Sequence, residues 1–532
     1  MRPLATAAAS VALALLTFFQ FPGHTWLQQD SQIYVPILDH LRDPAVLRND
    51  ILVQHPHVAF TLYDETALAL RAATGAGFGE VLAAQQIATR ALGIWGLLLM
   101  AEALGLAFAP ALLVAAICSL GALIPGPAVL TFEYEPTPRA FAVPLLVCAI
   151  GLSAHRRHLA AGAAAAAAFL YHPPTALLFW GVYFILALWP HAQRRARLAA
   201  LIPLAAAVPL LWAAARAQSA SGDAQRVFAR LDSSQEFLQR MRTAYVWVST
   251  WAAATIGHHL LILAVLVAAF MRIRQAVGVE LRVLLLGLAA LGLLTMPLSW
   301  LLLEQFHWGL VPQVQPMRAL LFLTLAMQFL CAAAGARAIV ARRPAEAFVW
   351  LAFAYLLPLQ PVLTGPFVWR RINLALALAA LTALAGIRWS PIVAVATFFA
   401  IPMLGGVVNY PRLHTPDLAQ LSAWARANTP RDAVFVFPGA NRSLAPGIFR
   451  SEALRAVYVD WKGGGQVNYL KDLGEQWWFR WRQIRNFQPA DLPQYTASGI
   501  TYVVLQDPLP RPPQFQNSSY VVYNLLPSEP RP

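Results

Sequence analysis

The sequence predicts an α-helical polytopic membrane protein of about thirteen spans, followed by a C-terminal extracytoplasmic α/β domain. Three observations predict this class. Hydrophobic residues make up 58% of the chain and charged residues only 12%, roughly half the usual charged share of a soluble domain. The apolar residues form long uninterrupted blocks rather than one-sided helical stripes. After residue 408 the blocks stop, and short strand-like and helical runs alternate instead.

The apolar blocks begin almost at the N-terminus. The first follows Arg2 and has no small-residue cleavage site after it, so we expect a retained helix rather than a signal peptide. Several blocks are short for a hydrocarbon core of about 30 Å. Residues 1–408 are therefore predicted to form the membrane domain, with a large first outer loop over 23–80. The predicted spans are 4–22, 82–104, 106–124, 139–154, 158–171, 174–190, 197–215, 251–271, 282–303, 318–336, 346–363, 371–387 and 391–408.

Arginine positions predict the orientation of these spans. With the N-terminus in the cytoplasm, arginines such as Arg156, Arg195, Arg272, Arg342 and Arg388 fall at inner span ends, as the positive-inside rule requires. An odd number of spans that starts inside finishes outside. The tail is therefore predicted to be periplasmic, and the protein to lie in a bacterial inner membrane.

The net charge of +14 does not indicate a nucleic-acid partner, because many of the arginines are explained as topology signals. Lysine is nearly absent and occurs only at Lys462 and Lys471. Cys118, Cys148 and Cys331 all fall inside apolar blocks, which argues against a disulfide framework, a zinc site or a catalytic thiol.

The tail, residues 409–532, carries signals of an α/β domain. Thr415 followed by Pro416 predicts the start of a helix that runs to about residue 427, with threonine as its cap and proline in its first turn. A second helix is predicted over 470–486. Strands are predicted over 433–437, 456–460, 501–505 and 520–524.

Polar residues at the predicted outer ends of the spans are the candidates for chemistry, because charged groups near a membrane are costly to place. Asp30 lies a few residues after the first span, where an acid can meet both an amphiphilic lipid and a polar acceptor. Glu-x-Glu-Pro-x-Pro-Arg begins at residue 133, and Gln-Pro-Met-Arg begins at residue 315. The candidates are Asp30, Tyr34, Glu133, Glu135, Arg139, His172, Gln315, Arg318, Arg370 and Arg371.

This order of features resembles the GT-C superfamily of integral-membrane glycosyltransferases, which use polyprenyl-phosphate-linked sugars. The contact points are the segment from Asp30 to Tyr34, the acidic stretch at 133–139 and the Gln-Pro-Met-Arg at 315–318. The thirteen-span plan with a soluble tail is similar to aminoarabinose-transferase-like and oligosaccharyltransferase-like members. The tail over 449–462 resembles that of uncharacterised bacterial proteins with the same plan.

The resemblance implies roles for the candidates. Asp30 would be the base that takes a proton from an acceptor hydroxyl, and Glu133 and Glu135 would lie on the acceptor or metal side. The remaining candidates would bind substrate or the lipid phosphate, for which arginine's forked donors are suited. The acceptor would be a glycan, a lipid or a protein. Some members use a divalent cation such as Mg²⁺ or Mn²⁺ and others do not, which leaves the cofactor open.

Each candidate also has a structural interpretation. Asp30 could cap a juxtamembrane helix, Arg139 could form an ion-pair cluster with the two glutamates, and Arg318 could reach to the membrane interface. His172 precedes two prolines and could satisfy a turn. A metal-binding pair of His55 and His57 is an unspecific pattern.

Two further patterns invite functional readings. The segment 462–465, Lys-Gly-Gly-Gly, is interpreted as a tight turn, since its lysine precedes the glycines, unlike that of a P-loop. The tryptophan-rich segment 476–482 could stack sugars, but a core or interface role is favoured.

Two other functions remain as alternatives. A transporter or lipid flippase would show internal repeats and charges near the bilayer midplane. The sequence shows no repeat and few central charges. A catalytically inactive GT-C-like scaffold in envelope assembly is the second alternative.

Overall fold

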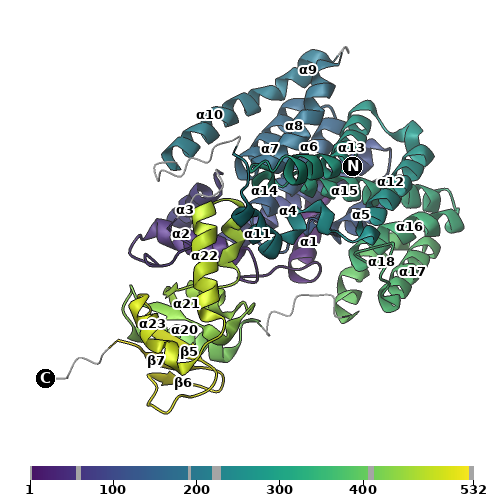
Figure 1. Ribbon diagram of the computed structural model, residues 1–532. Helices are drawn as coiled ribbons and strands as arrows, with labels where there is room; N and C mark the ends of the chain where they lie inside the picture. The colour runs from purple at the N-terminus through teal and green to yellow at the C-terminus, as the bar shows by residue number, and fades with distance from the viewer. Residues whose placement is uncertain (1–2, 55–60, 190–192, 219–228, 405–412, 527–532) are drawn as a thin grey trace.

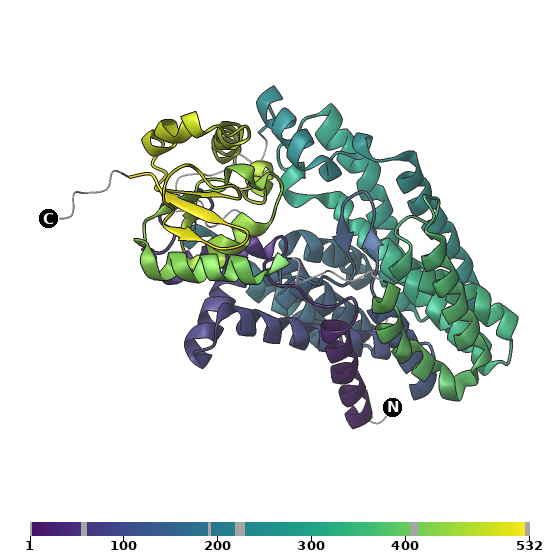
Figure 2. The ribbon, with the colours of Figure 1, turned by 90° about the horizontal axis from the view of Figure 1, so that it is seen from below.

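The computed structural model describes residues 3–54, 61–189, 193–218, 229–404 and 413–526. The chain forms a large helical part and a smaller C-terminal α/β part, which packs at one corner of the helices (Figure 1). Seen from below, α1 projects from the helical part while the sheet of the C-terminal part lies to one side (Figure 2). His55 and His57 lie outside the described residues.

Each predicted span falls on a helix, or in one case on the adjoining pair α9 and α10. The boundaries differ most at the last span, where the helix ends at Ala400. The helices are α1 (Pro3–Phe19), α4 (Phe78–Ala103), α5 (Phe108–Ser119), α6 (Pro138–Ala154), α7 (His158–Tyr171), α8 (Pro173–Leu188), α9 (Arg194–Ala199), α10 (Leu201–Gln218), α12 (Ala253–Ile273), α13 (Val279–Ser299), α15 (Leu320–Val340), α16 (Pro344–Leu359), α17 (Trp369–Leu384) and α18 (Gly386–Ala400).

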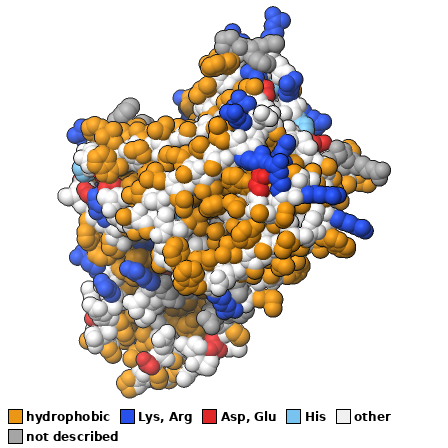
Figure 3. Space-filling view, turned by 90° about the vertical axis from the view of Figure 1, so that its right-hand side faces the viewer, with side chains coloured by type: hydrophobic (Ala, Val, Ile, Leu, Met, Phe, Trp, Pro, Cys, Tyr) orange, Lys and Arg blue, Asp and Glu red, His pale blue; other side chains and the backbone are white. Residues whose placement is uncertain are grey.

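Helix length and hydropathy support an integral membrane protein. Among the described residues, five helical stretches are long and apolar enough to cross a bilayer, and seven shorter apolar helices accompany them. The face of the helical part in Figure 3 is largely hydrophobic. Exposed large apolar side chains include Leu294, Leu381, Leu384 and Ile392. A soluble surface rarely exposes so much apolar area. Thirteen crossings stay a prediction.

The centre of the helical part is α15. Nearly all of its side chains are buried, and it packs against α5, α12, α13 and α16. Elsewhere, small residues let helices approach closely. A Cβ atom added to Gly96 in α4 would meet the backbone of Cys148 in α6 at 2.6 Å, and one added to Gly151 would meet the carbonyl oxygen of Gly96 at 2.5 Å. Close backbone approach of this kind is typical of packing between membrane helices.

The predicted inner loops contact one another. Arg272 Nε lies 2.5 Å from Glu346 Oε1, and Arg197 Nη2 lies 2.8 Å from Glu280 Oε1. Both pairs join turns that the arginine alternation assigns to the same side. The cytoplasmic assignment of that side stays a prediction.

The predicted outer segments contain more regular structure than the sequence suggested. The described part of the first outer loop holds two helices, and the segment over 125–138 begins inside a short hairpin. These elements are α2 (Ser31–Arg42), α3 (Tyr63–Thr74), β1 (Leu123–Ile124), β2 (Val129–Leu130), α11 (Ser233–Arg242), η2 (Ala244–Val246), η3 (Val248–Thr250), η5 (Trp300–Gln305), α14 (Val311–Val314) and η6 (Pro316–Ala319).

The C-terminal part is built on a five-stranded mixed sheet in the order β4-β3-β5-β7-β6. The strands β4, β3 and β5 are parallel to one another, and β7 runs antiparallel to both of its neighbours, β5 and β6. The predicted cap is confirmed, since the Thr415 side chain accepts a hydrogen bond from Leu418 N. The elements are α20 (Pro416–Asn428), β3 (Val434–Val436), α21 (Ala445–Ala453), β4 (Ala456–Val457), η9 (Gly463–Asn468), α22 (Lys471–Ile484), α23 (Leu492–Ala497), β5 (Tyr502–Leu505), β6 (Phe515–Gln516) and β7 (Val521–Asn524).

An apolar cluster joins the C-terminal part to the first outer loop. Val35 and Leu38 of α2 share one buried cluster with Phe435 of β3 and Phe449 of α21. Burying apolar surface is the main source of association free energy. The C-terminal part is therefore docked on the outer loops rather than tethered.

Candidate functional site

A cavity of about 310 Å³ lies between the outer segments and the C-terminal part. Six of the ten candidates from the sequence line it: Asp30, Tyr34, Arg139, His172, Gln315 and Arg318. They come from α2, α6, the α7–α8 turn and the segment that leads into α15. The C-terminal part closes the cavity with Lys462, Gly465, Gln466, Asn468 and Tyr469.

Asp30 lies at the N-terminal end of α2 but does not cap it, because its side chain makes no capping hydrogen bond. Its Oδ1 instead lies 2.6 Å from Nζ of Lys462. The Asp30 side chain is 43% exposed, so it faces the open cavity. The structure therefore gives this carboxylate a partner across the cavity rather than a local structural role.

Burial opposes ionisation of Asp30, but the charge and hydrogen bond of Lys462 outweigh it, with help from Arg318 and Arg139. Together they hold the pKa of Asp30 well below its usual range. Burial, and then the negative charge of Asp30, raise the pKa of Glu135 to about 7. Of the two neighbouring carboxylates, Asp30 therefore carries the more stable negative charge.

The two candidate glutamates are not among the described residues that line the cavity. Glu133 Oε1 accepts hydrogen bonds from Arg139 Nε at 2.9 Å and Nη2 at 2.7 Å. Glu135 accepts one from the Asp30 backbone N–H at 2.6 Å and one from the Ser31 hydroxyl at 2.9 Å. Both acids are therefore bonded to groups that hold the wall of the cavity, and an acceptor-side or metal-side role for either stays a prediction.

Four cations face the cavity: Arg139, Arg242, Arg318 and Lys462. Arg139 is paired with Glu133, and Arg242 Nε donates to the Trp461 carbonyl oxygen at 3.0 Å. Among the described residues, Arg318 has no ion pair, and its buried Nε has no hydrogen-bond partner. Its guanidinium lies 5.5 Å from the Tyr245 ring centroid. Arg318 is therefore the cation most available to an anionic ligand.

Three neutral polar groups complete the wall of the cavity. His172 Nδ1 accepts a hydrogen bond from Thr175 N at 3.3 Å at the start of α8. Burial, then Arg139 and Arg318, lower the pKa of His172 to about 3, so its ring is neutral near pH 7. Burial raises the pKa of Tyr34, which keeps its hydroxyl protonated as a donor. Gln315 adopts a left-handed backbone conformation with φ of 51°, and its buried Oε1 has no hydrogen-bond partner in the part of the chain that the structure describes.

Arg370 and Arg371 are not brought to the cavity. They begin α17, which packs against α16 and α18 on another side of the bundle. The sequence placed them correctly at a helix end, but that position alone does not decide which helix ends meet.

The described residues do not offer a divalent cation a set of ligands. No group of three or more His, Cys, Asp and Glu side chains among them is arranged to hold a metal ion. Asp30 and Asp64 both line the cavity, but Asp30 is already paired with Lys462.

Sequence reasoning missed every site residue from the C-terminal part, and Arg242 and Tyr245 from the segment around α11. One signal was available for Lys462, which is one of only two lysines in an arginine-rich chain. Nothing local to Arg242 distinguishes it from other surface arginines.

Comparisons with known proteins match a family model and several solved structures. The family model described as Domain of unknown function (DUF6798) matches residues 416–484, the part that contains Lys462. No curated protein matches the sequence. The chain is similar to the crystal structure of ArnT from Cupriavidus metallidurans in the apo state, with 12% identity, a TM-score of 0.49 and coverage of 98% of this chain and 97% of that one. ArnT from the same organism bound to undecaprenyl phosphate gives 12% identity, a TM-score of 0.46 and coverage of 99% of both chains.

Proposed function

We propose that this chain is a GT-C-type membrane glycosyltransferase that moves a sugar from a polyprenyl-phosphate donor to an extracytoplasmic glycan, lipid or protein. The observation that carries the proposal is the combination in one cavity of an ionised carboxylate, Asp30, with the guanidinium of Arg318, which forms no ion pair among the described residues. The arginine alternation supports a reaction on the periplasmic face of a bacterial inner membrane.

The charges of the cavity suit a phosphate-linked donor. Its described lining carries four cations, Arg139, Arg242, Arg318 and Lys462, and two carboxylates, Asp30 and Asp64, which leaves an excess of two positive charges. A sugar phosphodiester carries one negative charge, and the departing lipid phosphate gains a second. Fixed cations stabilise charge that develops during the reaction without the cost of reorganising solvent.

The proposed step needs one base and one anion site. The acceptor hydroxyl attacks the anomeric carbon of the sugar and forms the new glycosidic bond, while its proton passes to the Asp30 carboxylate. The bond from the anomeric carbon to the phosphate oxygen breaks, and the polyprenyl phosphate leaves with that electron pair. Arg318 donates to the phosphate oxygens, and Tyr34 and Gln315 supply neutral polar contacts at the wall of the cavity.

The test is donor turnover by the full chain reconstituted in liposomes. Undecaprenyl phosphate carrying radiolabelled glucose, mannose, galactose or aminoarabinose is supplied one donor at a time, with bacterial envelope extract as acceptor. The expected result is transfer of label from lipid to extract with release of undecaprenyl phosphate. An intact donor in every case, with labelled lipid moved across the bilayer instead, would contradict the proposal and favour a flippase.

A further inference from the structure

Among the residues that line the cavity, Lys462 is the one whose position is least explained by its neighbours in the sequence. Its ammonium lies 2.6 Å from Asp30, yet the two residues belong to different parts of the molecule. Its side chain is only 13% exposed. A lysine placed against the proposed base would weaken that base if the pair were permanent, because an ion-paired carboxylate holds a proton poorly.

Building on the proposed function, we propose that Lys462 is the phosphate ligand supplied by the C-terminal part. It pairs with Asp30 in this structure and turns to the donor's phosphate when the donor binds, which leaves Asp30 free to accept the acceptor's proton. The C-terminal part is then a component of the active site rather than an accessory.

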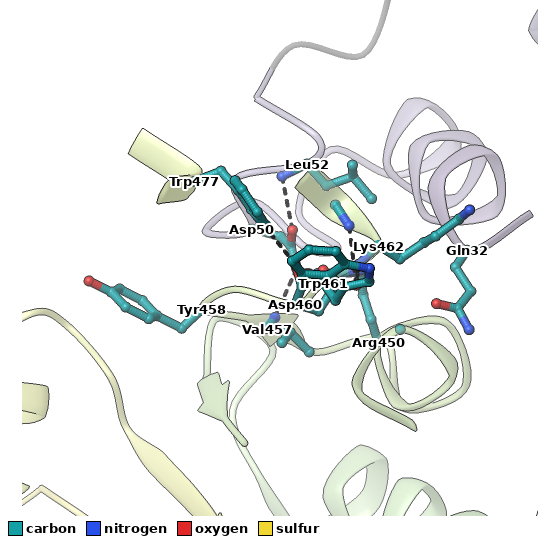
Figure 4. Close-up of polar contacts among 12 residues, drawn as sticks. Gln32, Asp50, Leu52, Arg450, Val457, Tyr458, Asp460, Trp461, Lys462 and Trp477 are labelled. Carbon is teal, nitrogen blue, oxygen red and sulfur yellow. Dashed lines mark hydrogen bonds and ion pairs between the residues drawn. The ribbon is translucent and has the colours of Figure 1, made fainter. Parts of the chain in front are cut away.

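The backbone of Lys462 is held by a buried chain of charges. Asp460 Oδ2 accepts hydrogen bonds from the Lys462 N–H at 3.1 Å and the Gly463 N–H at 3.3 Å. Its other oxygen accepts one from Arg450 Nη2 at 2.6 Å. Arg450 Nε in turn donates to Asp50 of the first outer loop at 2.6 Å. Figure 4 shows Asp50, Arg450, Asp460 and Lys462 gathered where the first outer loop meets the C-terminal part.

A second element fixes the same turn from the other side. Arg242 of α11 donates to the carbonyl oxygen of Trp461 at 3.0 Å and to that of Lys462 at 3.4 Å. With the backbone held on both sides, only the side chain of Lys462 is left to move. Lysine suits such a movement, since its ammonium is a compact charge on a flexible four-carbon stem.

The three glycines after Lys462 allow η9 to pack closely against its neighbours. A Cβ atom at Gly464 would lie 2.4 Å from the Trp477 ring, and one at Gly463 would lie 2.9 Å from Asp460 Oδ1. The glycine run therefore lets η9 pass close to α22 and lay residues 465–469 along the cavity. The tight turn expected at 462–465 is present as the start of the short helix η9. Because this helix lines the cavity next to Asp30, Lys462 reaches the cavity instead of the protein surface.

The competing explanation is that Lys462 only fastens the C-terminal part to the first outer loop. The two explanations differ in the effect of removing Asp30. If the lysine is shared between Asp30 and a phosphate, loss of Asp30 releases it and strengthens phosphate binding. If the pair is only a fastener, loss of Asp30 strengthens that binding only by removing a negative charge from the cavity. The gain is then the same when Lys462 has been replaced by methionine.

The experiment measures lipid binding by the full chain in nanodiscs, with undecaprenyl phosphate as probe and undecaprenol as its phosphate-free counterpart. Native mass spectrometry gives the dissociation constants. We expect Lys462→Met to weaken binding of undecaprenyl phosphate about ten- to a hundredfold, the usual range for a lost charge-assisted hydrogen bond. Undecaprenol binding should stay unchanged. Lys462→Arg should restore part of the loss. Asp30→Asn should strengthen binding several-fold when Lys462 is present and clearly less when it is combined with Lys462→Met.

The chain offers a matched control in its other lysine. Lys471 is exposed, pairs with Asp232 at 2.5 Å and does not line the cavity, so Lys471→Met should bind both lipids like the wild type. Thermal unfolding of each variant checks folding, and Lys462→Gln takes the place of Lys462→Met if the methionine variant does not fold.

The outcomes separate this inference from the proposed function. Wild-type binding by Lys462→Met together with weak binding by Arg318→Ala, or weaker binding by Asp30→Asn, would overturn the role of Lys462 and leave the glycosyltransferase proposal intact. A wild-type chain that bound undecaprenyl phosphate no better than undecaprenol would overturn both.

Discussion

Two of the charge clusters that join the first outer loop to the C-terminal part differ in their burial and in the number of hydrogen bonds that their members already make. In the first, Arg450 lies between Asp50 and Asp460, with side-chain exposures of 0%, 0% and 3%. Asp50 also accepts from the backbone N–H groups of Val457 and Leu52. In the second, Asp30 and Lys462 form a pair at the edge of an open cavity, where Asp30 is 43% exposed.

This difference indicates that the Arg450 cluster holds the two parts together, whereas the Asp30–Lys462 pair belongs to a binding site. The Arg450 cluster has few bonds left to offer, because nearly all its polar atoms except Arg450 Nη1 are already bonded. The cavity, by contrast, still has hydrogen-bond donors to offer a ligand, from the Arg318 guanidinium and from Lys462, which can change partners. The clusters are connected through Asp460, which bonds both Arg450 and the backbone of Lys462. Substitutions in the Arg450 cluster should therefore also disturb the cavity, whereas substitutions of Asp30 or Lys462 should leave the Arg450 cluster intact.

The largest expected effect comes from Arg450→Ala. Removing one partner from a buried ion cluster leaves uncompensated buried charge, which typically costs about 3–5 kcal/mol of stability. The matched control is Arg48→Ala, because the pair of Arg48 and Asp432 joins the same two parts but is about half exposed. That control should cost at most about 1 kcal/mol. Denaturant unfolding measures both, and equal losses would remove the distinction between the clusters.

Asp30→Asn should abolish sugar transfer while the midpoint of unfolding stays close to that of the wild type. Asparagine keeps the size of the side chain but cannot take up the acceptor's proton. The donor-turnover assay in liposomes measures this, with Asp232→Asn as control for an ion-paired aspartate away from the cavity. Full activity of the Asp30 variant would exclude Asp30 as base.

Arg318→Ala should lower donor use by about ten- to a hundredfold, corresponding to ~1.5–3 kcal/mol for lost bonds to a charged phosphate. Arg318→Lys should recover only part, since it keeps the charge but not the fork. The control is Arg370→Ala on α17, which should transfer sugar at the wild-type rate because Arg370 does not line the cavity. Similar losses at both positions would point to a general charge effect.

The smallest expected effect is a shift in pH dependence. Burial opposes ionisation of Asp30 and Lys462 favours it, so Lys462→Met should raise the pKa of Asp30. The residual transfer activity should then fall at a higher pH than in the wild type as the solution is acidified. Because the folded pKa lies below the usual 3.8, the stability from the pair is complete above about pH 4 and is lost as pH falls through the folded value. An unshifted acidic limb would contradict this effect of Lys462.

Much of the fold followed from local patterns in the sequence. The apolar blocks predicted the helices of the membrane part because a lipid-facing helix must be apolar over its whole length. Thr415 and Pro416 predicted the start of α20, and the strand-like runs predicted β3, β5 and β7. The two-residue strand β6 was missed, since so short a run has no detectable alternation.

The candidate site was predicted in part. Six residues at outer span ends meet at the cavity because alternation places those ends on one side of the bundle. Arg370 and Arg371 satisfy the same rule but lie elsewhere, since alternation fixes the side and not the neighbours of a helix. Glu135 was selected as an acid near the membrane, yet its oxygens are bonded to the backbone that holds Asp30.

The sequence by itself determined the membrane class, the helices and an acid just beyond the first span, because each of these depends on residues within a few turns of one another. Only the tertiary structure decided that Asp30 has Lys462 as its partner and that Arg318 has none among the described residues. Those outcomes depend on how α2, α11 and η9 pack against one another. Packing between segments far apart in the chain depends on the apolar surface that they bury together and on the pairing of their buried charges. A local pattern in the sequence reports neither of these.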